Sequence, residues 1–496
     1  MMLFLPILIS LVSIILLIAC RHRLKCQQWI SLLAIVAQLV AAFSIFLKLN
    51  ETGHLVAQAG SWPAPYGITF VADYTSAMLL IAVGLVSLAA IIYSIGFVDE
   101  VRQRGGLFVL FQGLLTGVYG SLLTGDIFNL YVWFEVMVIS SFVLITLGAE
   151  KQQLRASVKY LVMNLIGSML FVAAIGLLYS QLGTLNMADI AFKLRAQAIP
   201  PLVNSAIMLF FIAFGIKAAV FPFFFWLPAS YPRAPIAITA FFGATLTKVG
   251  VYVMMRFYSL FAQLDIAFWQ PVIFIVAGLT MLFGVLMAAS SYDIRKILSF
   301  HIISQIGYML MGIGLFSVIG LAGAIFFIVH NMFSKTATFM AGGLIYLYKG
   351  TYDLKKLGWI YKTKPFLAFL FLVPALSLAG IPPTPGFFGK FFLLYAGFEG
   401  GHWTITIVAL VVSILTLFSM VKIWNEAMWK PELESDKLKV KSVRPAAWMG
   451  TVLVVVFTLL LGLTVGFTYE YFVMAAQQLI DPMNYIKAVL PDLVLK

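Results

Sequence analysis

The sequence predicts an all-α polytopic membrane protein of about fourteen transmembrane helices, and three observations carry this prediction. Hydrophobic residues make up 62% of the 496 positions and charged residues only 10%, far outside the range of soluble domains. Apolar runs of about 20 residues recur from end to end, each long enough to cross a hydrocarbon core of roughly 30 Å. Several ionisable residues interrupt these runs, as they do in transport proteins.

Each predicted helix corresponds to one apolar run, and the runs follow one another with short polar connections. They begin near Leu3, Trp29, Tyr74, Leu107, Ile127, Val158, Leu202, Ile236, Phe268, Ile297, Gly320, Pro365, Trp403 and Pro445. The segment from Gln181 to Pro201 alternates apolar and polar residues, which predicts a short amphipathic helix at the membrane surface.

Positive charge is distributed unevenly over the predicted loops. If alternate loops face the cytoplasm, most of the 32 Lys and Arg residues fall on that side, including those of the loop from Glu426 to Pro445. Such a bias sets the orientation of a membrane protein, so the net charge of +13 indicates topology and not nucleic-acid binding. We therefore predict a multi-pass protein of the bacterial cell membrane with both termini on the outer face. The Lys and Arg residues assigned to that outer face are Lys48, Lys193, Arg195, Arg256, Lys487 and Lys496.

No connection is rich enough in Gly, Ser or Pro to divide the chain, so one transmembrane domain is predicted over residues 1–496. Two predicted helices, the seventh and the twelfth, carry a lysine beside proline, and they lie five helices apart. Because five is odd, the segments around them would be repeats of opposite orientation, a pattern typical of transporters. The predicted parts are the N-terminal helices (3–97), the first repeat (107–258), the second repeat (268–425) and the last helix with its tail (445–496).

Proline predicts that both of these helices are broken inside the membrane. Lys217 precedes Pro222, and Lys390 follows a group of three prolines. Proline removes a backbone donor and clashes with a carbonyl one turn earlier, which frees polar backbone that must contact protein or water. The prolines of the twelfth helix are Pro382, Pro383 and Pro385.

The most informative charged residues lie too deep to reach water along their own helix. Glu135 follows Asp126 by nine residues, or roughly 13 Å of rise, and Lys217 lies roughly 16 Å from the nearer helix end. An ionisable group at this depth costs several kcal/mol and is interpreted by default as part of an ion or proton path. A buried carboxylate and a buried amine are natural counterions, so we predict that Glu135 pairs with Lys217.

Lys248 and Lys335 are equally central by the same arithmetic, whereas Lys422 lies close enough to its helix end to extend toward water and is left out of the predicted path. Polar residues at helical spacing accompany the central lysines and are suited to holding water. His330 and Lys335 are five residues apart, so they would share a helix face only if the helix carried a local bulge. The accompanying residues are His301, Ser304, Gln305, Tyr308, His330 and Ser334.

These positions suggest a proton relay. An amine held away from water favours its neutral form, whereas a neighbouring carboxylate favours the ammonium form, so making and breaking a Glu135 pair would load and unload Lys217. The hypothesis is that protons pass from Lys217 through Lys248 and the His330/Lys335 region to Lys390. No catalytic residue, metal site or cofactor is predicted, because the two cysteines and the scattered histidines lack ligand spacing.

The same residues carry a resemblance to a known family. The run from Gly215 through Phe221-Pro222 to Pro228, followed by Thr247-Lys248-Val249-Gly250, resembles the proton-translocating antiporter-like subunits shared by respiratory complex I and Mrp-type multisubunit Na⁺/H⁺ antiporters. Ser334-Lys335-Thr336-Ala337 and the stretch from Gly380 to Lys390 are most similar to the D-type Mrp subunits. The complex I motif has a histidine where this chain has Phe224.

This resemblance implies a fourteen-helix core with inverted five-helix repeats, a Glu135/Lys217 pair, a central Lys248 and a terminal Lys390. It also implies a hetero-oligomeric complex with other Mrp subunits in the lipid bilayer, with protons as the cargo of this chain and Na⁺ transported by the whole complex. The main alternative is a proton-pumping membrane subunit of a respiratory complex I or a membrane-bound hydrogenase. A scaffold that transports nothing and a free-standing antiporter remain as further alternatives.

Overall fold

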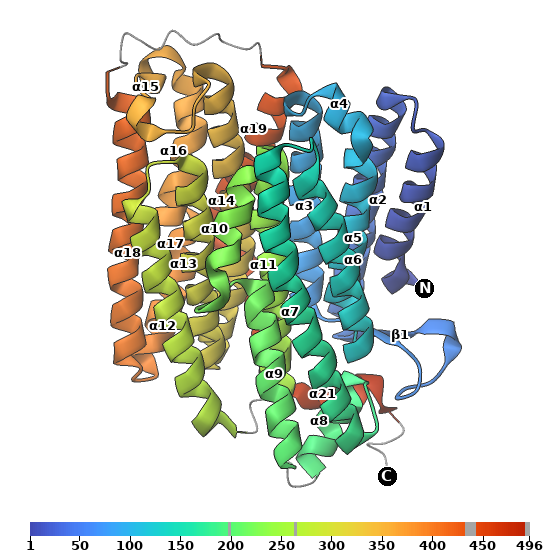
Figure 1. Ribbon diagram of the computed structural model, residues 1–496. Coiled ribbons are helices and arrows are strands. Elements are labelled where there is room, and N and C mark those ends of the chain that lie inside the picture. Colours follow the sequence, from blue (N-terminus) through green and yellow to red (C-terminus); the bar gives the residue numbers. More distant parts are fainter. Residues whose placement is uncertain (197–199, 262–264, 432–442, 492–496) are drawn as a thin grey trace.

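A computed structural model of the chain describes residues 1–196, 200–261, 265–431 and 443–491, and these residues form a bundle of long, roughly parallel helices (Figure 1). Thirteen helices in the described ranges are long and apolar enough to cross a membrane, and the apolar helix α16 is shorter. Counting α16 with its continuation α17 gives fourteen spans, which confirms the predicted all-α polytopic fold. Four lysines used in assigning the topology lie outside the described residues: Lys437, Lys439, Lys441 and Lys496.

The helix boundaries follow the predicted runs closely. Three helices precede the first predicted repeat: α1 (Leu5–Ala19), α2 (Leu24–Thr52) and α3 (Tyr74–Phe97). The first predicted repeat contains α5 (Phe108–Leu123), α6 (Ile127–Thr146), α7 (Lys151–Leu182), α9 (Pro201–Ala218) with the short α10 (Trp226–Ser230), and α11 (Ile236–Leu260). The second contains α12 (Ile266–Ser290), α13 (Ile294–Leu315), α14 (Val318–Lys349), α16 (Pro365–Ala379) with α17 (Pro385–Glu399), and α18 (Trp403–Trp424). The chain continues in α19 (Pro445–Leu463), α20 (Val465–Ile480) and α21 (Pro482–Val489).

Both predicted helix breaks are present, because α9 is separated from α10 and α16 from α17. The division into two inverted repeats and four parts stays a prediction.

The surface opposite α4 (Glu100–Arg102) and α15 (Ile360–Thr363) carries a small cap that lies at the bottom of Figure 1. The predicted amphipathic segment forms α8 (Met187–Ala196), which buries Ala188, Ile190, Ala191 and Leu194. Beside it lies a feature that the sequence did not predict, an antiparallel pair of strands, β1 (Leu55–Gln58) and β2 (Thr69–Ala72). Four residues are the shortest length from which a strand pattern is recognised, and the burial of these strands does not alternate, since all four residues of β1 are half-buried and all four of β2 are buried.

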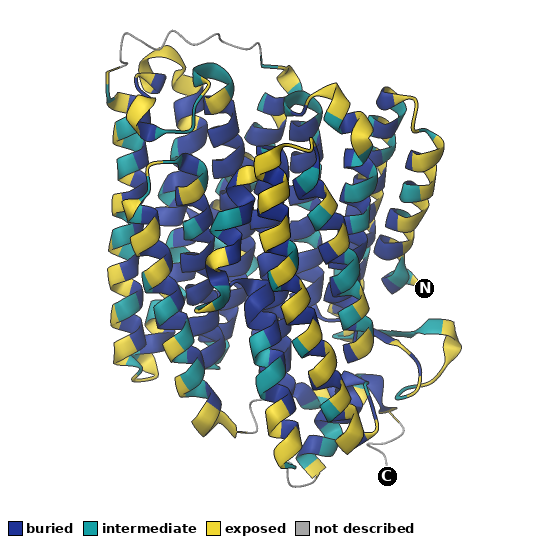
Figure 2. Cartoon of the chain, viewed as in Figure 1, coloured by how far each residue is buried: buried dark blue, intermediate teal, exposed yellow. Residues whose placement is uncertain are grey.

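Burial separates a central layer of helices from a lipid-facing shell (Figure 2). The most apolar windows of α11, α13 and α14 are 100%, 94% and 89% buried, whereas the window of α7 is 39% buried. A helix that must be covered on all sides lies inside the protein, while shell helices leave apolar side chains to lipid. The three central helices are also those that carry Lys248, His301, His330 and Lys335.

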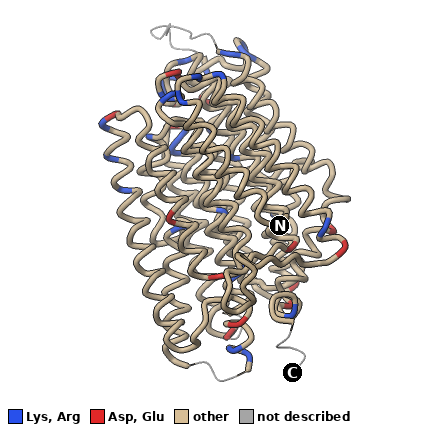
Figure 3. Tube along the Cα trace, turned by 90° about the vertical axis from the view of Figure 1, so that its right-hand side faces the viewer, with Lys and Arg blue, Asp and Glu red and all other residues tan. Residues whose placement is uncertain are grey.

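Lys and Arg gather at one end of the bundle, the upper end of Figure 3. We call this end the basic face and define it by the connections 20–23, 147–150, 231–235 and 350–359. This concentration of Lys and Arg at one end agrees with the expectation that alternate loops of the chain lie on the same side.

Candidate functional site

A hydroxyl group links the two deepest charges of the first half. Ser168 of α7 donates a hydrogen bond to Glu135 of α6, and Lys217 of α9 donates to Ser168 Oγ at 3.1 Å and to the carbonyl oxygen of Asn164 at 3.2 Å. The expected Glu135/Lys217 proximity is therefore present, but the ion pairs among the described residues do not include a direct one between them. Ser168 joins the acid to the amine, because one hydroxyl can donate and accept at once.

The break after Lys217 is stabilised by polar contacts. The helix α9 ends at Ala218, one residue after Lys217, and Ala219 adopts a left-handed conformation with φ of 60°. The indole N–H of Trp226 donates to the carbonyl oxygen of Ile216 at 3.0 Å, and the backbone N–H of Phe221 donates to Thr280 Oγ1 of α12 at 3.0 Å. Free backbone groups at membrane depth need such partners, and Thr280 supplies one from the second half of the chain.

Lys248 lies on the helix that packs against the end of α9. It lies on the fully buried helix α11 and donates to the carbonyl oxygen of Gly243 at 2.6 Å. Two residues further on, a Cβ atom at Gly250 would lie 2.9 Å from the backbone nitrogen of Ala218. Glycine therefore allows α11 to approach the end of α9 closely, which brings the helix of Lys248 against the helix of Lys217.

Lys335 and His330 of α14 diverge. The helix is continuous from Val318 to Lys349, so the bulge that would bring the two side chains to one face is absent from it. His330 Nδ1 lies 3.2 Å from both Ser334 Oγ and Ser377 Oγ, at the end of α16. Lys335 Nζ is buried without a hydrogen-bond partner among the described residues.

Several other polar atoms of the central helices are also buried without a hydrogen-bond partner among the described residues. Buried groups without a protein partner are generally satisfied by ordered water. This central region is therefore suited to holding a chain of water between lysines. Besides Lys335 Nζ, the buried atoms without a partner in the described part of the chain include Thr247 Oγ1, His301 Nδ1, Ser304 Oγ, both side-chain amide atoms of Gln305, His330 Nε2 and Asn331 Oδ1.

The second break is held by Lys390 itself. Its Nζ atom donates to the carbonyl oxygens of Leu378 and Ala379 at 3.0 and 2.9 Å and to Ser413 Oγ of α18 at 3.0 Å. These carbonyls belong to the last turn of α16, where the helix dipole is negative and favours a cation. Gly380 has φ of +86°, and a Cβ atom there would lie 2.9 Å from Lys390 Cδ. Glycine is therefore favoured at this position by the left-handed backbone and by the close approach of the lysine side chain.

Two of the accompanying residues predicted from the sequence form direct contacts with α18. His301 Nε2 lies 2.9 Å from Ser419 Oγ, and the hydroxyl of Tyr308 donates to the carbonyl oxygen of Ala409. Lys390 Nζ lies 5.5 Å from the centroid of the Tyr308 ring.

Sequence reasoning missed the side chains that bridge the charged residues, namely Ser168, Ser377, Ser413 and Thr280. Asn164 and Ser168 are four residues apart on α7 and so share one face, a signal that could have been noticed. Single serines and threonines on the other helices gave no such signal, since most of them bond to their own helix.

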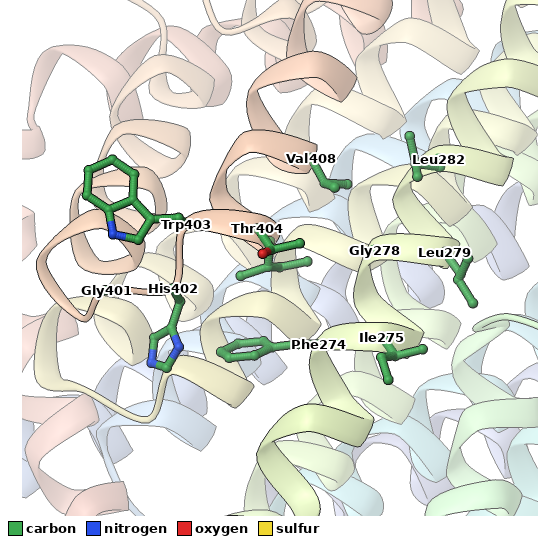
Figure 4. A pocket seen from close by; sticks show the side chains of 11 residues that line it. Phe274, Ile275, Gly278, Leu279, Leu282, Gly401, His402, Trp403, Thr404 and Val408 are labelled. Atoms are coloured by element: carbon green, nitrogen blue, oxygen red, sulfur yellow. The ribbon is translucent and has the colours of Figure 1, made fainter.

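One surface hollow lies away from these charges. A groove of about 570 Å³ runs between α12 and the start of α18, lined by apolar side chains such as Ile275 and Leu282 together with His402 (Figure 4). The imidazole of His402 lies 4.8 Å from the ring of Phe274, measured between centroids. Lys217, Lys248, Lys335 and Lys390 do not line this groove.

Buried lysines at two broken helices, joined by a polar central layer, are typical of polytopic membrane transport subunits. Comparison with known proteins gives the family. Residues 124–416 match the family described as NADH:quinone oxidoreductase/Mrp antiporter, transmembrane region, and this chain belongs to that family.

Individual relatives match the chain over nearly its whole length. The protein named as the D subunit of a Na(+)/H(+) antiporter in Alkalihalophilus pseudofirmus is 41% identical over 490 residues, covering 98% of this chain and 99% of the relative. The protein of the same name from Bacillus subtilis is 38% identical over 488 residues, with 98% and 99% covered. A chain in the structure of the Mrp complex from Dietzia sp. DQ12-45-1b superposes with a TM-score of 0.92 at 31% identity, with 99% of each chain covered.

Proposed function

We propose that this chain is the proton-translocating D-type subunit of an Mrp multisubunit Na⁺/H⁺ antiporter. The observation that carries the proposal is the hydrogen-bonded connection Glu135–Ser168–Lys217 at the first helix break. Lysines at the centre and at the second break continue from it toward the other side of the subunit. The curated relatives named as antiporter subunits support the assignment to this type of complex.

In the proposed mechanism, Lys217 exchanges its proton according to its distance from Glu135. Two unit charges about 4 Å apart interact by roughly 4 kcal/mol at an effective dielectric of about 20, which corresponds to roughly a thousandfold change in proton affinity. Movement of Lys217 away from the acid favours release of the proton toward Lys248, and its return favours uptake. Water held by His330, Ser334 and the polar atoms around Lys335 carries the proton on to Lys390.

Partner subunits are part of the proposal. Glu135 is only half-buried, although it lies deep in the membrane, and lipid tails offer no hydrogen bonds to a carboxylate. Neighbouring side chains on the same side are strongly exposed, such as Ile139 at 61% and Met169 at 70%. Lipid accommodates these apolar side chains but not the carboxylate, and a companion membrane subunit that covers this side would offer Glu135 further polar contacts. We assign protons to this chain and Na⁺ to the complex, since one deep acid provides few of the oxygen ligands that a hard cation prefers.

The proposed location is the bacterial plasma membrane, with the basic face in the cytoplasm and both termini on the outer side. The concentration of Lys and Arg at one end supports this orientation through the positive-inside rule. Figure 1 places the N-terminus and the C-terminal helix α21 away from α4 and α15.

Lys217→Ala and Glu135→Ala test the proposal in the assembled complex. Everted vesicles from a strain without other Na⁺/H⁺ antiporters are given Na⁺, and the pH change is followed with a fluorescent dye. Each variant is expected to reduce the initial rate at least tenfold at an unchanged amount of complex, because the first relay step is lost. Rates equal to those of the parent complex would contradict the proposal and favour a scaffold role.

A second candidate remains because the matching family also includes NADH:quinone oxidoreductase subunits. In that case, the purified complex would contain flavin or iron–sulfur subunits and would couple proton movement to electron transfer. Mass spectrometry and absorption spectra of the complex purified through this chain distinguish the two candidates.

A further inference from the structure

A row of polar side chains leads from Lys390 along α18 to the basic face. These residues recur at every third position, so each is turned by about 60° around the helix from the one before it, and the last is a lysine close to water. The row consists of Ser413, Thr416, Ser419 and Lys422. Ser413 bonds to Lys390, and Lys422 lies nine residues further on, roughly 13 Å closer to the basic face. The helix α18 packs against α12 and α13, and Thr416 and Ser419 are fully buried in this packing. Nine residues make about two and a half helical turns, so Ser413 and Lys422 lie on opposite sides of α18 and Ser419 lies between them in height.

His301 of α13 contacts this row at Ser419. Its Nε2 atom lies 2.9 Å from Ser419 Oγ, one helical turn deeper than Lys422. Its Nδ1 atom is buried without a partner among the described residues, as are Ser304 Oγ and the side-chain amide of Gln305 on the same helix. One side of the imidazole therefore faces the row on α18, and the other faces polar groups suited to holding water.

Lys422 connects this arrangement to the aqueous phase. The side chain is half-buried, and its Nζ atom donates to the carbonyl oxygens of Ala289 and Ser291 at 2.6 Å each. It also lies 4.7 Å from the centroid of the Tyr292 ring. These contacts hold the amine at the end of α12, at the point where the row on α18 reaches the basic face.

We infer that Lys422, Ser419 and His301 form a branch through which Lys390 exchanges protons with the aqueous phase at the basic face. This inference rests on the proposed function and extends it to an access route in the second half of the subunit. Lys422 takes a proton from water and passes it to the Ser419 hydroxyl, which delivers a proton to His301 Nε2. The ring then releases its Nδ1 proton to water beside Ser304 and Gln305, from which the Lys390 amine takes it up. Each transfer breaks one N–H or O–H bond and forms another.

A purely structural role for Lys422 predicts a different outcome for arginine. A guanidinium can also bond to the carbonyl oxygens that end α12, but it does not release its proton at physiological pH. Lys422→Arg therefore keeps the helix cap and removes proton transfer, whereas Lys422→Met removes both. Lys355→Met is the matched control, since Lys355 Nζ lies 4.8 Å from the same Tyr292 ring but belongs to an exposed residue of the connection 350–359.

The experiment measures Na⁺-dependent pH changes in everted vesicles that contain the whole complex. Lys422→Arg and Lys422→Met are each expected to lower the initial rate at least tenfold, with Lys355→Met within twofold of the parent. A parent-like rate for Lys422→Arg would overturn the inference, whether or not Lys422→Met is impaired, because Lys422 would then act only as a cap.

Two further arms keep the result interpretable. If the Lys422 variants fail to assemble, Ser419→Ala is expected to slow exchange at least fivefold. Ser419→Thr keeps the hydroxyl and is expected to stay near the parent rate. A parent-like rate for Ser419→Ala would overturn the inference. Lys217→Ala is measured in parallel. A parent-like rate for Lys217→Ala overturns the proposed function itself, whereas a block by Lys217→Ala with parent-like Lys422→Arg overturns only the branch.

Discussion

At the scale of single residues, the site is defined by short polar side chains placed between charged ones. Ser168 links Glu135 to Lys217, and Ser413 contacts Lys390. A hydroxyl between two ionisable groups allows proton transfer without direct contact, because it accepts a hydrogen bond from one group and donates to the other.

Ser168→Ala is expected to slow Na⁺-dependent proton exchange about tenfold or more. The variant removes hydrogen bonds to two charged groups, each worth about 1.5–3 kcal/mol, while Ser168→Thr keeps the hydroxyl and is expected to stay within a few-fold of the parent. Ser180→Ala is the matched control, because Ser180 lies on the same helix and its exposed hydroxyl donates to the local carbonyl oxygen of Leu177. Equal rates for the two alanine variants would contradict the bridging role.

At the scale of helices, two close approaches determine the geometry around the breaks. Gly250 lets α11 approach the end of α9, and Gly380 leaves room for the side chain of Lys390 after α16. The first brings the helix of Lys248 against the end of α9, and the second lets Lys390 bond to the carbonyl oxygens of Leu378 and Ala379.

Gly250→Ala is expected to lower stability by about 1–3 kcal/mol, which is the usual cost of overpacking, and to slow exchange by separating Lys248 from the first break. Gly176→Ala is the control, since a Cβ atom there meets no neighbouring atom within 4 Å and alanine favours the helix. The measurement is the midpoint of thermal loss of monodisperse complex in detergent. Indistinguishable midpoints for the two variants would show that the close approach contributes nothing to stability.

Helix positions were predictable, and so was the proximity of Glu135 and Lys217, whereas the side chains that bridge the helices were not. Long apolar runs and prolines identify the spans and the breaks near Pro222 and Pro382, because these features depend on local chemistry. The Ser168 bridge depends on three helices meeting at one point, and the orientation of His330 away from Lys335 depends on α14 remaining regular over its whole length. The strands β1 and β2 depend on pairing across a loop, for which the sequence offers only weak local signals.

At the scale of the whole molecule, a buried ion pair joins parts that are distant in sequence. Arg256 of α11 bonds to Asp73, the residue that caps α3, and both are nearly fully buried, at 7% and 1% exposure. The guanidinium also lies 5.3 Å from the centroid of the Tyr485 ring on α21. The N-terminal helices, the first half and the C-terminal helix therefore meet at the surface opposite the basic face.

Asp73→Asn is expected to destabilise the complex by about 3–5 kcal/mol, because removing one member of a buried pair leaves the other charge uncompensated. The double variant Asp73→Asn with Arg256→Gln is expected to recover part of that loss. Thermal midpoints of the purified complex test both expectations. A double variant less stable than Asp73→Asn alone would show that Arg256 acts through its aromatic contacts and not through the pair.

The contacts of Lys390 have a consequence for the energetic cost of moving a proton. As an ammonium, the side chain uses its three donors on Leu378, Ala379 and Ser413. A neutral amine keeps two N–H groups for the carbonyl oxygens and presents a lone pair to Ser413. Rotation about the C–O bond of Ser413 then lets its hydroxyl donate a hydrogen bond to the neutral amine. Both protonation states of Lys390 therefore have protein hydrogen-bond partners, and loss of the proton requires no movement of the backbone.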